Sequence, residues 1–340
     1  MKNKETVCAV VVTYNRKELL IECLDALCKQ TRPIDAMYII DNFSNDGTAE
    51  LLLENGYLAE LPPENLNEPF QMEIDFDNSK LLGVFDNGIE SREAKIENFI
   101  KIYYVRMNEN TGGAGGFYEG VKKGYEKGYD WLWLMDDDGI PKNDCLELLL
   151  SKNHIANFLA PLVVRIDKKD EMSFGLGRDL MTIQDCQLRA KDGILENVAN
   201  PFNGILISKK LVQKIGYPKK EMFIWGDEVE YQLRSLNSGL GVATVVSAIH
   251  YHPKGRVEQA NIKGTKYKVN FQNNNLKNYC DMRNQSYIAY KYRKNRLIRL
   301  FVKYSLFFVS HLDLKGYFFY LSALKDGICE TWGKEKRYLK

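Results

Sequence analysis

A stretch in the middle of the chain reads Asp130-Trp131-Leu132-Trp133-Leu134-Met135-Asp136-Asp137-Asp138-Gly139. Its apolar residues Trp131 to Met135 predict a short buried strand. The strand runs into three consecutive carboxylates, after which Gly139 and Pro141 turn the chain away. Adjacent carboxylates repel one another, and hard divalent cations relieve that repulsion because they prefer oxygen ligands. The pattern therefore indicates either a metal site that could hold a diphosphate or, for these aspartates taken by themselves, a solvated acidic loop.

The segments before this stretch predict an open α/β sheet. Val7 to Thr13 is a continuous apolar run, typical of a strand covered on both faces of a parallel sheet. Glu18 to Gln30 has helical spacing, Ala36 to Ile40 predicts a second strand, and a polar turn then begins a helix from Ala49 to about Asn55. In such sheets ligands bind beyond the carboxyl ends of the strands. We therefore expect the polar residues at these strand ends to face a ligand.

Two further strand ends carry such residues. Asp41 follows the second strand, where a base or ribose would be bound, although a turn or cap role is equally compatible with the sequence. Ile100 to Val105 predicts another strand, and Gly-Gly-Ala-Gly-Gly-Phe at 112–117 then opens a helix that runs from Phe117 to about Lys127. Glycines let the backbone approach a ligand, and a helix N-terminus favours an anion. The segment lacks both the dinucleotide fingerprint and the P-loop pattern, so a simple tight turn is the alternative.

Later segments add an acidic pair and two histidines. Asp227 and Glu228 stand at the head of a predicted helix, where capping alone is a sufficient reason for acidic residues. His250 and His252 lie two apart on an extended segment and therefore share a face. That arrangement suits metal binding, and a structural role is the alternative.

Composition limits the class of protein. The 340 residues are 45% hydrophobic and 27% charged, with a net charge of +2, which allows one large domain with an appendage or two domains. Seven scattered cysteines without a Cys-x-x-Cys pair predict a reducing compartment and argue against a zinc ribbon or disulfide scaffold. The N-terminal apolar run is too short for a signal peptide, and no stretch approaches ~18 apolar residues. We therefore expect a cytoplasmic protein.

The C-terminal region differs in character. Between Arg283 and Leu312 there are seven basic residues and no acidic one, interleaved with tyrosines and phenylalanines. A helix of this composition can lie on an anionic membrane surface with its basic residues at the headgroups. Nucleic acid is a rival partner for an aromatic and basic stripe, and a solvated helical face is the plain alternative.

Taken in order, these features resemble the inverting glycosyltransferases of family 2, which have the GT-A fold. Four segments resemble the motifs of the bacterial galactofuranosyltransferases, with rhamnosyltransferases next: Gly112 to Phe117, Leu134 to Asp138, Asp227-Glu228-x-x-Tyr231-x-Leu233-Arg234, and Tyr279-x-x-x-Arg283-Asn284. The resemblance spans roughly residues 6–290. It implies the nucleotide-diphospho-sugar transferase (GT-A) fold, a mainly parallel open α/β sheet with helices on both faces, plus a C-terminal helical extension. The implied domains are a catalytic domain at 1–255, with an insertion at 56–100, and a membrane-associating basic and aromatic region at 256–340.

The resemblance also implies roles for individual residues. Asp136 and Asp138 would hold Mn²⁺ or Mg²⁺, with His252 as the protein's further ligand and His250 as the alternative. The donor UDP-sugar would be bound by the strand-end residues Thr13, Tyr14, Asn15, Arg16, Asp41, Asn110, Gly112, Gly113, Asp136 and Asp137. The acceptor side would be formed by Trp225, Tyr279 and Arg283.

Inversion requires a general base that deprotonates an acceptor hydroxyl. In the family this is an aspartate, the second member of an acidic pair, and the corresponding residue here is Glu228. Its longer side chain moves the carboxylate by about one C–C bond, ~1.5 Å, and catalysis is sensitive to such displacements. We expect Glu228 to be the base, with Asp227 as the other candidate.

The resemblance therefore implies a metal-dependent hexosyltransferase that moves galactofuranose from UDP-galactofuranose to a lipid-linked glycan of a cell-surface polysaccharide, such as an O-antigen, capsule or galactan. It would associate peripherally with the inner face of the plasma membrane through its C-terminal helices, with no nucleic-acid partner. A rhamnosyltransferase using dTDP-rhamnose is the first alternative. A non-catalytic nucleotide- or nucleic-acid-binding α/β protein is an alternative from another class.

Overall fold

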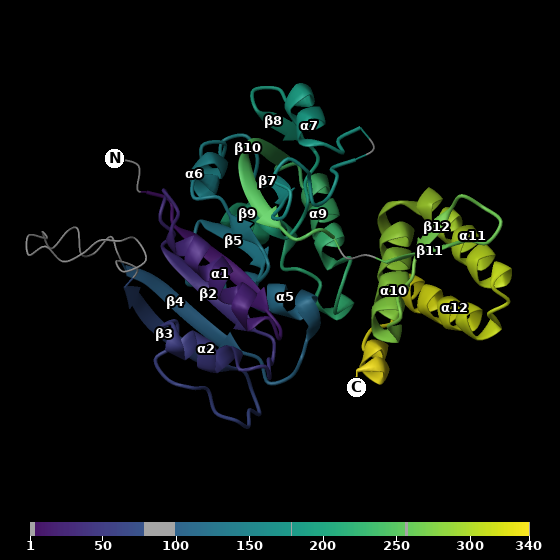
Figure 1. Cartoon of the computed structure of the whole chain (residues 1–340), viewed down its shortest axis with the longest axis horizontal. Coiled ribbons are helices and arrows are strands. Elements are labelled where there is room, and N and C mark those ends of the chain that lie inside the picture. The colour runs from purple at the N-terminus through teal and green to yellow at the C-terminus, as the bar shows by residue number, and fades with distance from the viewer. Residues whose placement is uncertain (1–3, 78–98, 178, 256–257, 340) are drawn as a thin grey trace, which may run out of the picture. The chain divides into compact units, whose positions relative to one another are not determined.

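The computed structural model describes residues 4–77, 99–177, 179–255 and 258–339 (Figure 1). The chain forms two compact units. The first, called here the sheet unit, comprises residues 1–111, 116–217 and 234–254, and the second, the helical unit, comprises 112–115, 218–233 and 255–340. The helical unit thus takes two short segments from within the expected catalytic domain. Of the expected insertion at 56–100, residues 78–98 lie outside the described residues.

The sheet unit is an α/β structure in which strands and helices largely alternate. Its strands are β1 (Val7–Thr13), β2 (Ala36–Asp41), β3 (Phe70–Asp77), β4 (Phe99–Arg106), β5 (Trp131–Asp136), β6 (Ile140–Pro141), β7 (Phe158–Arg165), β8 (Ile194–Glu196), β9 (Asn203–Ser208) and β10 (Val242–His252). Its helices include α1 (Lys17–Cys28), α2 (Thr48–Glu54), α6 (Cys145–Leu150), α7 (Ile183–Arg189) and α8 (Lys209–Ile215). Two more helices have residues in both units, α5 (Gly112–Lys127) and α9 (Asp227–Asn237).

The ten strands form one mixed sheet in the order β3-β4-β2-β1-β5-β9-β7-β10-β6, and β8 pairs with β10. β4, β2, β1 and β5 run parallel, as do β7 and β10, whereas β9 is antiparallel to both of its neighbours. The expectation of a mainly parallel sheet is confirmed. In the parallel register Val12 lies beside Asp136 and Thr13 beside Asp41, so the polar ends of β1, β2 and β5 reach the same edge of the sheet.

Alternation along β1 divides the core between the two faces of the sheet. Val7, Ala9 and Val11 pack with the apolar side of α1 in the main hydrophobic cluster. Val10 and Val12 face the other way and pack against Gly120 and Gly116 of α5. The contact is so close that a side chain at either glycine would overlap the valine. Helices therefore cover both faces of the central strands, as the continuous apolar sequence of β1 predicts.

The helical unit contains three longer helices, α10 (Asn275–Tyr292), α11 (Lys294–Ser310) and α12 (Leu314–Ile328), together with a small hairpin, β11 (Gln259–Asn261) and β12 (Lys268–Asn270), and two short 3₁₀ turns, η1 (Lys220–Met222) and η2 (Lys334–Tyr338). Its core is strongly aromatic and includes Tyr304, Phe307, Phe308 and Tyr320. Much of the C-terminal aromatic content therefore packs internally. Among the described residues, no helix combines the length and the apolar character needed to cross a bilayer.

Candidate active site

The three aspartates after β5 meet the end of β1 and the start of α1. Thr13 Oγ1 donates a hydrogen bond to Asp137 Oδ2 at 2.7 Å. The Arg16 guanidinium lies 3.1 Å from Asp137 Oδ1 and 2.9 Å from Asp138 Oδ2. The side chains of Asp137 and Asp138 are almost fully buried. The aspartates are therefore part of an organised, partly neutralised cluster, and the alternative of a solvated acidic loop does not describe them.

His252 completes this cluster from the end of β10. Its Nε2 lies 3.1 Å from Asp138 Oδ1, and its Nδ1 lies 2.6 Å from the carbonyl oxygen of Pro253. Because a carbonyl oxygen only accepts hydrogen bonds, Nδ1 carries a proton, and Nε2 is the nitrogen that faces the carboxylate. Burial by itself would lower the pKa of His252, but the hydrogen bond and negative charge of Asp138 raise it above its ordinary value. Nε2 thus faces Asp138 either as an N–H donor or as a ligand that shares a cation with the carboxylate.

His250 has a different environment. Its ring is fully buried, and side chains at Gly139 or Gly204 would collide with it. Burial, followed by the nearby His252, lowers the pKa of His250 to about 3, so the ring is neutral. Within the described residues neither ring nitrogen has a hydrogen-bond partner. Of the two candidate histidines, His252 is the one within 3.1 Å of a carboxylate oxygen.

The electrostatics of the aspartates fit a divalent cation. Burial, reinforced by the negative charges of Asp138 and Asp137, raises the pKa of Asp136 to about 8. Burial also raises the pKa of Asp137 to about 6, although Arg16 and Thr13 oppose the shift. The cluster thus holds more acidic groups than it can keep ionised by itself, and Mn²⁺ or Mg²⁺ would relieve that excess. Within the described residues, no three His, Cys, Asp or Glu side chains form a ready-made cage. A metal here would need ligands from substrate or water, as is usual for Mg²⁺ at diphosphates.

Asp41, expected at the nucleotide, is held by internal partners. Its fully buried carboxylate accepts hydrogen bonds from the Ser44 amide at 2.8 Å, Tyr104 Oη at 2.7 Å and Arg106 Nη1 at 2.7 Å. Arg106 also donates to the Ser44 carbonyl. Asp41 therefore shapes the loop after β2 and orients Arg106, which agrees with the turn role left open by the sequence.

The neighbouring loops are tied together by asparagines. Asn15 adopts a left-handed conformation (φ 53°), and its side-chain oxygen accepts a hydrogen bond from the Asn45 amide at 2.7 Å. Asn42 bonds Asn110 at 3.1 Å and accepts from the Thr111 amide at 2.9 Å. Tyr14 is exposed. The loops after β1, β2 and β4 thus form one connected polar rim on the sheet unit.

In the helical unit, the loop before the acidic pair has a strained backbone. Phe223 and Trp225 both have positive φ, at 65° and 61°. Asn284 on α10 fixes this loop, since its Nδ2 donates to the carbonyl oxygens of Met222, Ile224 and Trp225 at 2.9, 3.1 and 2.6 Å. Such strain persists only where the surroundings enforce it, and it is concentrated at functional sites.

The expected acceptor-side residues divide into two groups. Tyr279 and Arg283 are fully buried, with Tyr279 Oη donating to Asp326 at 2.8 Å and Arg283 bonding both Glu335 and the Met222 carbonyl. In this structure Arg283 therefore supports the loop, Tyr279 joins α10 to α12, and neither side chain presents a surface to an acceptor. Trp225 is partly exposed, with Lys277 Nζ 5.6 Å from the centre of its ring, and remains a candidate for substrate contact.

The glycine segment contacts the same loop. The structure begins α5 at Gly112, five residues before the expected start at Phe117. Gly112 has φ 71°, and a side chain there would overlap the Phe223 carbonyl, to which the Ala114 amide donates at 3.0 Å. Gly113 faces open space. The close approach of the Phe223 backbone therefore explains why residue 112 is a glycine. Gly113 has no neighbour in the space that a side chain would occupy.

The acidic pair begins α9. Asp227 is 4% exposed, whereas Glu228 is partly exposed and its Oε2 accepts a hydrogen bond from the Gly226 amide at 2.7 Å. Asp281 on α10 adds a nearby negative charge, and burial, with a contribution from Glu228, raises the pKa of Asp281 to about 6. Of the pair, Glu228 is the carboxylate that solvent and substrate can reach more readily.

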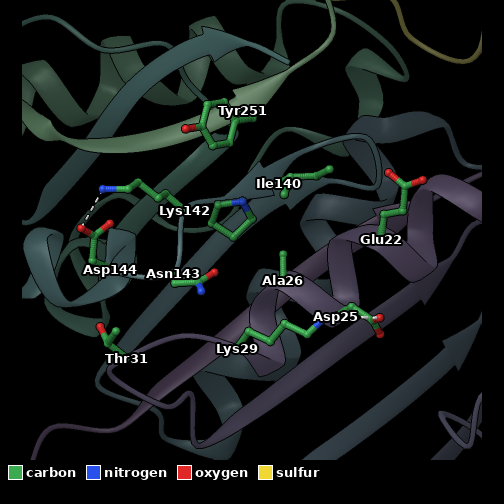
Figure 2. Close-up of a pocket in the computed structure, with 11 residues that line it drawn as sticks. Glu22, Asp25, Ala26, Lys29, Thr31, Ile140, Lys142, Asn143, Asp144 and Tyr251 are labelled. Carbon is green, nitrogen blue, oxygen red and sulfur yellow. Dashed lines mark hydrogen bonds and ion pairs between the residues drawn. The ribbon is translucent and has the colours of Figure 1, made fainter. Parts of the chain in front are cut away.

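A cavity of about 680 Å³ lies in the sheet unit between α1 and the segment that follows the aspartates. Figure 2 shows Glu22, Asp25 and Lys29 along α1, facing Lys142 and Asp144. The two lysines pair with aspartates within the cavity, Lys142 with Asp144 at 3.0 Å and Lys29 with Asp25 at 3.9 Å (Figure 2). None of the expected site residues lines this cavity.

Residues 8–56 and 72–202 match the family model described as "Glycosyl transferase family 2". The chain belongs to glycosyltransferase family 2. It is therefore an enzyme that transfers sugars, and the alternative of a non-catalytic binding protein is set aside. The matched residues include the Asp136 to Asp138 cluster but end before Asp227, Glu228 and His252.

Among known proteins, this family 2 chain is 29% identical over 327 residues to galactofuranosyltransferase GlfT1 of Mycolicibacterium smegmatis, covering 93% of this chain and 94% of the relative. It is 24% identical to the dTDP-rhamnosyl transferase RfbF of Shigella flexneri, over 47% of this chain and 55% of that protein. Among solved structures it resembles GalNAc-T7 crystallised with UDP, GalNAc and Mn²⁺, with a TM-score of 0.54, 14% identity and coverage of 97% of this chain and 57% of the other. The GT-A fold and the expected likeness to galactofuranosyltransferases are confirmed.

Some residues of this glycosyltransferase site were not singled out from the sequence. Arg106 ends β4 beside Asp41, and its place at a strand end was the available signal. Glu335 pairs with Arg283, and Asp281 lies near Glu228. Neither gave a signal in the sequence, because each is distant from its partner in the chain and meets it only through helix packing.

Proposed function

We propose that this family 2 glycosyltransferase transfers galactofuranose from UDP-galactofuranose to a lipid-linked glycan of a cell-surface polysaccharide. The observation that carries the proposal is the cluster in which Arg16 and His252 converge on Asp138. A divalent metal held by these residues, together with the Arg16 guanidinium, would provide what a sugar diphosphate needs. The similarity to a galactofuranosyltransferase over nearly the full length of both chains supports the choice of sugar.

The proposed donor site consists mainly of residues of the sheet unit. Asp136, Asp138 and His252 would hold Mn²⁺ or Mg²⁺, which would neutralise the departing diphosphate as a Lewis acid. The Mn²⁺ in the GalNAc-T7 structure belongs to a protein of the same fold and supports this assignment. Asp137 and Arg16 would orient the donor sugar and diphosphate. Uridine and ribose would be bound along the polar rim by Thr13, Tyr14, Asn15 and Asn110, with Gly112 and Gly113 as further contacts, and the buried Asp41 would act by shaping the loop after β2.

Glu228 is the proposed general base. It would take the proton from an acceptor hydroxyl as that oxygen attacks the anomeric carbon, so that configuration inverts. Its exposure and its orientation by the Gly226 amide support it over the nearly buried Asp227. Trp225 would contact the acceptor, Arg283 would act by supporting the loop, and Tyr279 would act by fixing α10 against α12.

Residues 1–255 are the proposed catalytic domain, and 256–340 the region that associates with a membrane. The helical unit exposes large apolar side chains along α11 and the turn into α12, namely Ile298, Phe301, Val302, Leu306, Val309, Leu312, Leu314 and Phe318. Leu312 is 89% exposed. Apolar side chains beside cationic ones suit the surface of an anionic bilayer. The enzyme would thus be cytoplasmic and peripheral at the inner face of the plasma membrane.

A panel of nucleotide sugars tests the donor and the metal together. Purified full-length protein would be assayed with a synthetic lipid-linked acceptor, each donor in turn, and either Mn²⁺ or EDTA. We expect transfer from UDP-galactofuranose, and we expect EDTA to abolish it. The anomeric configuration of the product, measured by NMR, should be inverted relative to that of the donor. Transfer from dTDP-rhamnose alone would replace the galactofuranose assignment with the alternative that the weaker similarity to RfbF supports.

A further inference from the structure

The helical unit contains a second cavity, of about 540 Å³, where α10 passes into α11. Each residue that lines it ends in a cationic or hydrogen-bonding group, while the apolar stems of these side chains contribute to its walls: Tyr292, Arg293, Lys294, Asn295, Arg296 and Arg299. None of these residues belongs to the proposed donor or base site. Arg293, Lys294 and Arg299 are exposed and Arg296 is partly buried, and a bound anion would reduce the repulsion among the four cations.

Within the described residues, none of the four cations forms an ion pair. Arg296 is partly buried and donates to Gln285 at 2.8 Å, and burial together with the positive charge of Arg293 lowers its pKa. Two carboxylates lie close by without lining the cavity: Glu230 accepts a hydrogen bond from Tyr292 at 2.7 Å, and Asp281 attracts Arg296. The cavity itself therefore keeps a surplus of positive charge.

The backbone reinforces this preference for anions. The cavity surrounds the N-terminus of α11, a helix of 17 residues with no acidic residue in its first turn. Its N-cap residue, Arg293, provides no side-chain acceptor for the first amides. Uncapped amides and the helix dipole both favour a bound anion, and paired arginines favour phosphate in particular.

The next turns of the same helix are apolar and exposed. Ile298, Val302, Leu306 and Val309 recur at helical spacing, and Ile298 is 67% exposed. A ligand that suits both features has a phosphate group attached to a hydrocarbon chain. Nucleic acid would satisfy the cations but would leave the apolar side chains in water.

We propose that the cavity formed by Arg293, Lys294, Arg296 and Arg299 binds the phosphate group of a membrane lipid. The shared chemistry is a lipid phosphate or diphosphate, either an anionic phospholipid headgroup or the diphosphate of a polyprenyl carrier. The proposal rests on the proposed function: the phospholipid source deepens the proposed membrane association, and the polyprenyl source depends on the proposed lipid-linked acceptor, which would bring that diphosphate to the protein.

Vesicle flotation of the full-length protein in EDTA, without donor, tests the site separately from sugar transfer. Neutral vesicles would be supplemented with phosphatidic acid, with a polyprenyl diphosphate, or with oleate at matched surface charge. The cavity variant is Arg293→Gln/Lys294→Gln/Arg299→Gln, which leaves the hydrogen-bonded Arg296 intact. The control variant, Lys263→Gln/Lys266→Gln/Lys268→Gln, removes the same charge from the β11–β12 hairpin.

We expect the cavity variant to bind phosphate-bearing vesicles about tenfold or more weakly than the parent, while the control changes much less and oleate vesicles show no such difference. A loss confined to polyprenyl diphosphate identifies the carrier, and a loss with both phosphate lipids identifies a general headgroup site. Equal losses in the two variants would overturn the proposal, because diffuse charge would then explain binding. Loss of single-stranded RNA binding with unchanged flotation would also overturn it, in favour of nucleic acid.

The outcome is independent of the proposed transferase activity. A cavity variant that floats like the parent while the parent transfers galactofuranose rejects the cavity site only. A protein that binds lipid phosphate through the cavity but transfers no galactofuranose rejects the donor assignment only.

Discussion

At the scale of single residues, Asp138 is the group on which the proposed donor site depends. One of its carboxylate oxygens faces Arg16 and the other faces His252. We expect Asp138→Ala to fold normally and to lose Mn²⁺-dependent UDP binding, with transfer reduced at least about 100-fold, because a metal ligand and the partner of both cations disappear together. Calorimetric titration of UDP with and without Mn²⁺ measures the effect.

The matched control for this change is Asp144→Ala. Asp144 is close in sequence but pairs with Lys142 at a partly exposed position. Metal-dependent UDP binding should survive in that variant. Undiminished binding in Asp138→Ala would mean that the cluster is structural.

The choice of base is also a question at this scale. We expect Glu228→Gln to lower kcat by about 10²–10⁴-fold with little change in donor KM, because the amide cannot accept the acceptor's proton. Asp227→Asn should retain more activity, since Asp227 is nearly buried. Steady-state kinetics of both variants decide the matter, and an active Glu228→Gln beside an inactive Asp227→Asn would transfer the role to Asp227.

At the scale of elements, α5 packs on the sheet through glycines. An added methyl group at Gly120 would overlap Val10, whereas one at Gly113 would meet nothing within 4 Å. We expect Gly120→Ala to destabilise the protein by about 1–3 kcal/mol through overpacking. Gly113→Ala should be neutral or stabilising by up to about 1 kcal/mol, since alanine favours helix. Thermal unfolding of the two variants compares them directly, and equal midpoints would refute this packing role.

The loop before α9 depends in the same way on α10. We expect Asn284→Ala to lower kcat more than it raises donor KM, because three carbonyl oxygens that hold the loop before Glu228 lose their donor. Ser286→Ala is the control on the same helix, since its buried hydroxyl bonds only the Met282 carbonyl one turn earlier. If both variants show the same kinetics, Asn284 has no specific positioning role.

At the scale of the whole molecule, stability should depend on pH through Asp281. Its folded pKa, about 6, lies above the ordinary aspartate value because of burial. The folded state therefore holds this proton more tightly, so the stabilisation is complete below about pH 4 and is lost as pH rises through 6. Two pKa units correspond to up to about 3 kcal/mol.

Asp281→Asn removes this penalty and keeps an acceptor for Tyr304. We therefore expect the variant to unfold at a higher temperature than the parent at pH 8, with about half of that difference at pH 5. Melting curves at both pH values test this. A constant difference between variant and parent would show that Asp281 does not carry the pH dependence.

How much of this could be predicted differs between the two units. In the sheet unit, individual strands and the α/β class follow from apolar runs that alternate with helices, and the carboxylates were found because they stand directly after such a run. The helical unit was recognised by composition, yet much of its aromatic content is core. Composition cannot distinguish a side chain that faces solvent from one that faces another helix.

The sequence by itself determined a mainly parallel sheet with polar strand ends, because burial on both faces imposes a local, continuous apolar pattern. It also determined the family, through motifs that are short and contiguous. Only the tertiary structure decided that Asp138 meets Arg16 and His252, that Asp41 is bonded internally, and that Arg283 supports a loop. These contacts join residues far apart in the chain, and their geometry is set by strand register and helix packing, which no local pattern encodes.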